Sequence, residues 1–201
     1  MRMLSLLPLF LLLAACAGGA SRPVDLALRD LGEPAAILPA GAIALARIEV
    51  RTAAWLAGPA QHYRLSYADP LRRHSYAESR WAAPPGELLE RWLQRSLPAG
   101  QATGDACRLV LELDELEQRF DGPRSSQVVL EARVSLQPLR GDTVHAQQAF
   151  HIVKPAGSPD ARGGVQATRA GADALAQELV RWLAELARDR PQTIVMCKEK
   201  S

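Results

Sequence analysis

The covalent chemistry that the sequence encodes most clearly belongs to Cys16. Residues 13–16 read Leu-Ala-Ala-Cys, the pattern of a bacterial lipobox, in which the cysteine thiol receives a diacylglyceryl group before the chain is cut in front of it. Arg2 and an apolar run over residues 4–13 precede the cysteine, as in a secretory signal, and this run is shorter than the roughly 20 apolar residues of a membrane-spanning helix. The alternative is an ordinary signal peptide that happens to contain a cysteine. The lipobox is favoured because the tetrapeptide comes directly at the end of the apolar run.

Acylation makes residues 1–15 a signal peptide and tethers the mature chain to a membrane. The N-acyl and diacylglyceryl groups on Cys16 are the only non-protein groups that we expect, and each buried methylene contributes about 0.8 kcal/mol to anchoring. Ala17 follows the cysteine, which is typical of lipoproteins sorted to the outer membrane, so we expect the chain on its periplasmic side. Residues 16–41 are predicted to be the lipidated cysteine and a flexible tether, because the first of them are small and polar.

The two other cysteines, Cys107 and Cys197, have the opportunity to pair in an oxidising periplasm. Such a disulfide would connect the C-terminal tail to a predicted strand and would contribute about 2–4 kcal/mol to stability. The alternative is one buried thiol and one free thiol in the tail.

The remaining polar residues do not form the pattern of an active site or a metal site. The four histidines lack the helical i, i+4 spacing of a zinc site, and the sequence holds no G-x-S-x-G turn and no phosphate-binding glycine loop. Four acidic residues near one strand are expected to form a solvated edge: Glu112, Asp114, Glu115 and Glu117. We therefore expect neither catalysis nor a bound metal. Cleavage before Cys16 leaves one net positive charge, which gives no support for nucleic-acid binding.

The hydrophobic pattern over residues 42–201 predicts a single α+β domain, with a mixed or antiparallel sheet and two main helices on one of its faces. Alternation with a period of two predicts strands, and apolar residues at helical spacing predict helices. The predicted strands cover residues 42–50, 62–67, 73–78, 107–113, 128–137 and 143–153, the helices cover 86–97 and 165–188, and residues 193–197 form a further edge strand.

One segment is richer in aromatic and arginine side chains than a plain scaffold requires. These residue types are enriched in the energetic centres of protein interfaces, so we consider the segment a candidate partner-binding surface. The alternative is that the aromatic residues fill the core or support the start of the following helix. The candidate residues are Trp55, Tyr63, Arg64, Tyr67, Tyr76, Arg80 and Trp81.

The same segment carries a family resemblance. Residues 63–67 read Tyr-Arg-Leu-Ser-Tyr, and residues 73–85 contain a second tyrosine and end in Trp-Ala-Ala-Pro-Pro before a leucine-rich helix. This order resembles the ABC-type transport auxiliary lipoproteins, the PqiC/YmbA-like group, and the likeness extends over nearly the whole mature chain.

The resemblance implies an outer-membrane lipoprotein that assists an envelope lipid-transport system. Such systems combine an ABC ATPase and permease with a periplasmic protein of the mammalian-cell-entry (MCE) type, and the chain would dock that MCE-domain protein at the outer membrane. Two alternatives remain open: a periplasmic carrier that binds phospholipid in a cleft between sheet and helices, and a structural or regulatory envelope lipoprotein. The family supplies no catalytic residue for this sequence.

Overall fold

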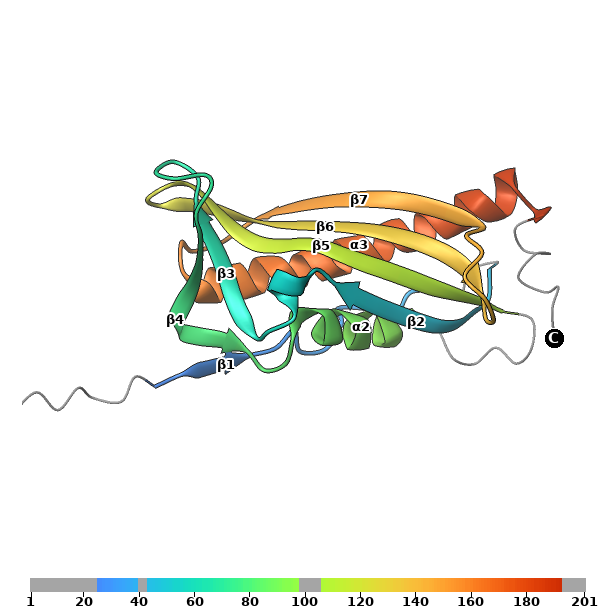
Figure 1. The fold of residues 1–201 in the computed structure, drawn as a ribbon, viewed down its shortest axis with the longest axis horizontal. Helices are drawn as coiled ribbons and strands as arrows, with labels where there is room; N and C mark the ends of the chain where they lie inside the picture. The colour runs from blue at the N-terminus through green and yellow to red at the C-terminus, as the bar shows by residue number, and fades with distance from the viewer. Residues whose placement is uncertain (1–24, 40–42, 98–105, 193–201) are drawn as a thin grey trace, which may run out of the picture.

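A computed structural model describes residues 25–39, 43–97 and 106–192. Within these residues one mixed sheet is covered on one face by two helices, which confirms the predicted fold class (Figure 1). The strands are β1 (Ala27–Arg29), β2 (Leu45–Thr52), β3 (Ala60–Leu65), β4 (Arg73–Trp81), β5 (Cys107–Gly122), β6 (Ser125–Pro138) and β7 (Ala146–Pro155); the helices are the short 3-10 turn η2 (Ala54–Leu56), α2 (Pro85–Ser96) and α3 (Ala161–Asp189).

The long antiparallel strands β5, β6 and β7 form the body of the sheet. Their apolar residues alternate with polar ones, so one face is buried against the helices and the other carries charged side chains. The connection between β6 and β7 contains Gly141, whose φ of 86° lies in the left-handed region that glycine adopts without steric cost.

Strand β5 pairs in parallel with two different strands along one edge. β2 pairs with its first half and β3 with its second half, while a register shift lies between Leu113 and Glu115. A bulge of this kind inserts an extra residue and reverses which residues face the core. The buried apolar positions therefore change from Leu111 and Leu113 to Leu116 and Phe120, a switch from odd to even numbers.

Strand β4 turns a corner next to β3. Ala60 pairs with Arg80 and His62 pairs with Ser75, so Gln61 alone lies opposite four residues of β4. The extra residues bend β4 away from the hairpin that it forms with β3, and its last residues then pair in parallel with β1 (Figure 1).

The two helices begin where their sequences supply a suitable start. Pro85 occupies the first turn of α2, where its missing N–H is not needed. Asp160 caps α3 by accepting a hydrogen bond from the Gly163 backbone N–H at 2.7 Å. Both helices bury their leucine and tryptophan stripes against the inner face of the sheet, in one continuous core.

The structure corrects the predicted tether over residues 16–41. Residues 27–29 form β1, which pairs with β4, and Leu31 is buried in the core. The folded unit therefore starts well before residue 42, because a short strand and one buried leucine attach this segment to the sheet. The tail strand predicted at residues 193–197 lies outside the described residues. No helix of the described part of the chain is long and apolar enough to cross a membrane.

Candidate functional site

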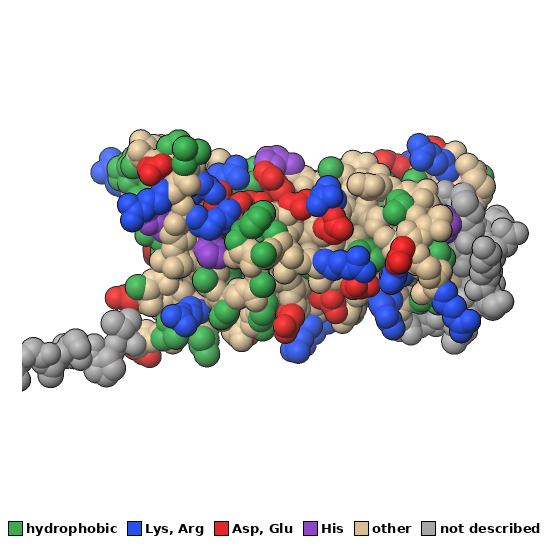
Figure 2. Space-filling model, viewed as in Figure 1, with side chains coloured by type: hydrophobic (Ala, Val, Ile, Leu, Met, Phe, Trp, Pro, Cys, Tyr) green, Lys and Arg blue, Asp and Glu red, His purple; other side chains and the backbone are tan. Residues whose placement is uncertain are grey.

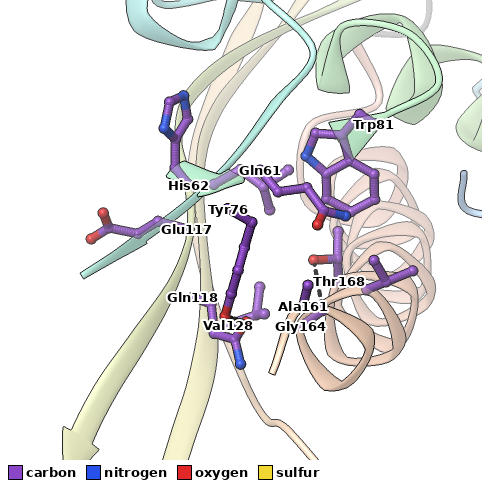
Figure 3. Close-up of a pocket in the computed structure, with 12 residues that line it drawn as sticks. Gln61, His62, Tyr76, Trp81, Glu117, Gln118, Val128, Ala161, Gly164 and Thr168 are labelled. Carbon is purple, nitrogen blue, oxygen red and sulfur yellow. Dashed lines mark hydrogen bonds between the residues drawn. The ribbon is translucent and has the colours of Figure 1, made fainter. Parts of the chain in front are cut away.

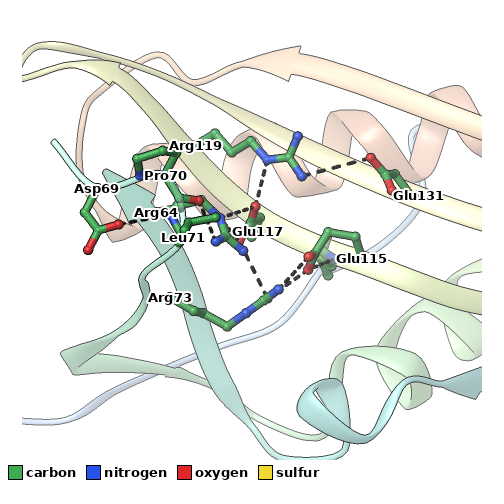
Figure 4. A network of polar contacts seen from close by, with 10 residues as sticks. Arg64, Asp69, Pro70, Leu71, Arg73, Glu115, Glu117, Arg119 and Glu131 are labelled. Carbon is green, nitrogen blue, oxygen red and sulfur yellow. Dashed lines mark hydrogen bonds and ion pairs between the residues drawn. The ribbon is translucent and has the colours of Figure 1, made fainter. Parts of the chain in front are cut away.

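The β3–β4 hairpin, which carries most of the predicted partner-binding residues, is joined to β5 by buried charges. Arg64 of β3 donates from Nε to both carboxylate oxygens of Glu117, at 3.0 and 3.2 Å (Figure 4). Arg73 of β4 forms a bidentate pair with Glu115 and also lies 3.6 Å from Glu117. Arg119 adds a third cation, at 2.7 Å from Glu117. Two arginines of the hairpin are thus fixed to two carboxylates of the central strand.

Our expectation that Glu115 and Glu117 lie on a solvated strand edge is wrong. Both residues are buried, and the Glu117 side chain has no exposed surface. The bulge after Leu113 changes the phase of β5, and the hairpin arginines then cover the two carboxylates. The spacing of three between Leu113 and Leu116, in place of two, is the sequence signal that would have shown this change.

The charge balance at Glu117 keeps this buried carboxylate ionised. Burial by itself would raise the pKa of Glu117, but hydrogen bonds from Arg64 and Arg119 outweigh it and hold the pKa below its ordinary value. The hydrogen bonds to Glu115 likewise raise the pKa of Arg73. The cluster therefore connects fully charged partners through hydrogen bonds, which are stronger than those between neutral groups.

Aromatic side chains support the same hairpin from its other side. The Tyr63 ring stacks on His74 with centroids 5.0 Å apart and lies 4.6 Å from the Tyr76 ring. The Tyr76 hydroxyl donates to the Gln118 side-chain oxygen at 2.9 Å. Burial raises the pKa of Tyr76, with smaller effects from Tyr63 and Asp160, so this hydroxyl remains a donor. These tyrosines hold the hairpin in place.

Trp55 differs from these supporting residues because its side chain faces solvent. It lies in η2, between β2 and β3, and is 53% exposed. The Arg73 guanidinium lies 5.9 Å from its ring centroid, within the range of a cation–π contact, and the His62 ring donates from Nε2 to its carbonyl oxygen at 3.0 Å. In Figure 2 hydrophobic side chains over this part of the molecule are bordered by arginine and acidic side chains. Trp55 is therefore an exposed aromatic residue on a fixed cationic support.

A small pocket lined by polar and apolar side chains lies behind the hairpin, between β3, β4, β5 and the first turns of α3 (Figure 3). Its volume of about 20 Å³ is enough for one water molecule. Gln61 lines it, is buried, and has no hydrogen-bond partner for either side-chain polar atom among the described residues. Trp81 also lines the pocket and is buried in the core. The pocket is too small for a lipid chain.

The seven predicted partner-binding residues divide by exposure. Trp55, Tyr67 and Arg80 are exposed; Tyr63, Arg64 and Tyr76 are half-buried and hold the hairpin; Trp81 is buried next to the start of α2. Of the seven, Trp55, Tyr67 and Arg80 are available to a partner without a change of conformation. Sequence reasoning missed Glu115, Glu117 and Gln61, and it also missed Leu71, an exposed leucine in the β3–β4 turn.

Of the three cysteines, Cys107 lies within the described residues. Cys107 begins β5, is fully buried and takes part in a disulfide. Cys197, its predicted partner, and Cys16, the predicted site of acylation, lie outside the described residues. The pairing of Cys107 with Cys197 and the acylation of Cys16 therefore stay predictions. No group of histidine, cysteine and acidic residues in the described part of the chain could hold a metal ion.

Comparisons with known proteins identify the fold and the family. The structure is similar to the crystal structure of protein XCC0632 from Xanthomonas campestris, with a TM-score of 0.68, 18% identity, and coverage of 82% of this chain and 99% of that one. A second crystal structure, of an uncharacterized protein, has a TM-score of 0.61 and 17% identity over 79% of this chain and 98% of the other. These likenesses show a shared fold. No curated protein matches the sequence.

A family model, described as the ABC-type transport auxiliary lipoprotein component, matches residues 56–180. The match covers the hairpin, the charged cluster and most of α3. It agrees with the resemblance that the tyrosine strands and the Trp-Ala-Ala-Pro-Pro element indicate. The chain therefore belongs to the family of ABC-type transport auxiliary lipoproteins.

Proposed function

We propose that the chain is an outer-membrane lipoprotein that docks the periplasmic MCE-domain protein of an ABC-type lipid-transport system, with Trp55 at the centre of the docking surface. Family membership supports a role as an accessory to ABC transport in the cell envelope. The lipobox at Cys16 and the Ala17 that follows it support anchoring in the outer membrane. The main support for placing the docking surface here is that the Trp55 ring is exposed and in contact with the Arg73 guanidinium.

A tryptophan in this setting is suited to binding a protein. Arg73 is held by Glu115 and cannot move freely, so its contact with Trp55 limits the freedom of the ring before any partner arrives. A side chain ordered in advance loses little conformational entropy on binding. Tryptophan and arginine are also the residue types that dominate interface energetics when a partner buries them.

The alternative of a lipid carrier finds little support in the described residues. The apolar pocket between the helices and the sheet, lined by Leu31, Trp81 and Leu89 among others, has a volume of about 10 Å³. Sites for small organic ligands are usually about 300–1,000 Å³ in volume, so this pocket does not fit an acyl chain. A larger pocket of about 200 Å³ lies over Glu112, Arg133 and Gln137, which are polar. We therefore favour a role in docking the MCE-domain protein over a role as a lipid carrier.

The experiment is affinity capture of the tagged, full-length, lipidated protein from gently solubilised envelopes, with co-purifying proteins and lipids identified by mass spectrometry. We expect an MCE-domain protein with the unmodified chain, a strong loss of it with Trp55→Ala, and full recovery with Leu139→Ala. Leu139 is a suitable control because it is also an exposed apolar residue, just after β6 at the end of the sheet away from the β3–β4 turn. Circular dichroism checks that both variants fold.

Three outcomes would contradict parts of the proposal. If the Trp55→Ala variant captures as much MCE-domain protein as the unmodified chain, Trp55 is not part of the docking surface. Bound phospholipid without an MCE-domain protein would favour the carrier. Cell-wall or β-barrel proteins in place of a transport component would favour a structural or regulatory lipoprotein.

A further inference from the structure

The turn between β3 and β4 exposes side chains of the kinds found at a membrane surface. Leu71 is 91% exposed, Tyr67 is about half exposed, and Arg72 next to the leucine is exposed as well. In proteins that touch a bilayer, leucine enters the hydrocarbon, tyrosine rings lie at the level of the headgroups, and arginine reaches the phosphates. The turn thus combines these three side chains within six residues.

The turn is held in a fixed shape. Asp69 accepts a hydrogen bond from the Leu71 backbone N–H at 3.0 Å, and Arg64 donates to the Pro70 carbonyl oxygen at 2.8 Å (Figure 4). Arg64 is itself bound to Glu117, so the charged cluster extends into the turn. These contacts fix the peptide group between Pro70 and Leu71, and the Arg72 backbone N–H donates to the Asp69 carbonyl oxygen at 3.4 Å. The backbone of the turn therefore presents Leu71 to solvent.

The chain length before β1 limits how far this end of the molecule can be from the anchor. Asp25 follows Cys16 by nine residues, which span at most about 30 Å when fully extended. β1 starts at the same end of the molecule as the β3–β4 turn (Figure 1), and its Leu28 is 65% exposed. An acylated Cys16 therefore keeps this end close to the bilayer.

We infer that this end of the molecule rests on the lipid surface of the membrane, with Leu71 inserted among the acyl chains and Tyr67 and Arg72 among the headgroups. The inference rests on the proposed function only through the acylation of Cys16, since it requires an anchored chain. It assigns the β3–β4 turn to lipid and leaves Trp55, on η2, to the protein partner.

The test places a fluorescent reporter at the turn of the full-length, lipidated protein. Leu71→Trp and Leu139→Trp are reconstituted in vesicles of phosphatidylethanolamine and phosphatidylglycerol, with and without bromine on the acyl chains. The tryptophan emission added by each substitution, relative to the unmodified protein, is then compared between the two kinds of vesicle. We expect brominated lipid to quench the emission added at position 71 and to leave that at position 139 unchanged. Equal quenching at the two positions, or none at either, overturns the inference.

Further readouts separate this inference from the docking proposal. Mass spectrometry of the N-terminal peptide tests acylation, and an unmodified Cys16 overturns the inference together with the anchoring part of the proposed function. In another outcome, the emission added at position 71 is insensitive to brominated lipid and shifts when an MCE-domain protein is added. That result also overturns the inference of lipid contact and assigns the turn to a protein. Unquenched emission at position 71 with normal, Trp55-dependent capture overturns it while the docking proposal stands.

Discussion

Arg64 and Glu117 face each other across β3 and β5, with the arginine Nε within 3.2 Å of both carboxylate oxygens. Fifty-three residues separate them in the chain, so the pair connects the hairpin to the body of the sheet. The same arginine donates to the carbonyl oxygen of Pro70 in the β3–β4 turn. Arg64 therefore links the buried carboxylate of Glu117 to the turn.

Glu117→Gln should lower the free energy of unfolding by about 2 kcal/mol, less than the roughly 3–5 kcal/mol of a fully buried pair because its arginines are partly exposed. The amide fills the same space but leaves Arg64 and Arg119 without their anion. Urea unfolding monitored by circular dichroism measures the change. The control is Glu112→Gln, whose exposed pair with Arg133 should contribute less than about 1 kcal/mol. Similar losses in the two variants would show that the Glu117 cluster has no special role.

The charged cluster should also make stability depend on pH in acid. The pKa of Glu117 is lowered in the folded state, so its ionised form stabilises the fold fully above the unfolded-state pKa of about 4.3. That contribution is lost as the pH falls through the lower, folded-state pKa. Unfolding free energies measured between about pH 3 and pH 6 should therefore fall more steeply with acidification for the unmodified protein than for Glu117→Gln. Parallel curves for the two proteins would contradict this assignment.

The start of α3 should tolerate no side chain at Gly163. A Cβ there would meet the backbone carbonyl oxygen of Ser158, which cannot rotate away, so Gly163→Ala should cost about 1–3 kcal/mol. Gly171→Ala is the matched control in the same helix. Its Cβ would meet only Ile152 and Lys154 side-chain atoms at 3.9 Å, and the better helix former should add about 0.5–1 kcal/mol. Thermal unfolding of the two variants should shift in opposite directions, and a shift in the same direction would be inconsistent with the close contact.

Two buried serines should respond oppositely to replacement by alanine. The Ser79 hydroxyl has no hydrogen-bond partner among the described residues, so Ser79→Ala should raise the unfolding free energy by up to about 1 kcal/mol. The Ser126 hydroxyl accepts a hydrogen bond from the Gln118 side-chain nitrogen at 2.8 Å, and Ser126→Ala should cost about 1–2 kcal/mol. Chemical denaturation distinguishes the two. A loss of stability in Ser79→Ala would mean that its hydroxyl is satisfied in solution.

Local patterns were sufficient to predict much of this fold. Period-two alternation correctly indicated β6 and the first half of β5, but not the second half of β5, which follows the bulge. Apolar residues at helical spacing indicated α2 and α3. These signals are local because each element buries one face of its own sequence. The end of the tether was missed because β1 has only three residues, and pairing with a distant strand holds it in place.

The exposure and burial of the candidate-site residues were harder to predict from the sequence than the fold. The type of residue selected Trp55 as a candidate for partner binding, but it did not separate this exposed residue from Tyr63 and Tyr76, which support the hairpin. Burial of Glu117 depends on a bulge in β5 and on arginines more than forty residues away. The bulge leaves one trace in the sequence, the spacing of three between Leu113 and Leu116, but the pairing with the distant arginines leaves none.

The most direct test of the docking claim is photo-crosslinking in living cells from a photoreactive amino acid at position 55 of the full-length lipoprotein, with position 139 as the control. We expect the adduct formed from position 55 to contain an MCE-domain protein and position 139 to yield no such adduct. An adduct from position 139 alone, or adducts from position 55 that contain no transport component, would contradict a docking role for Trp55.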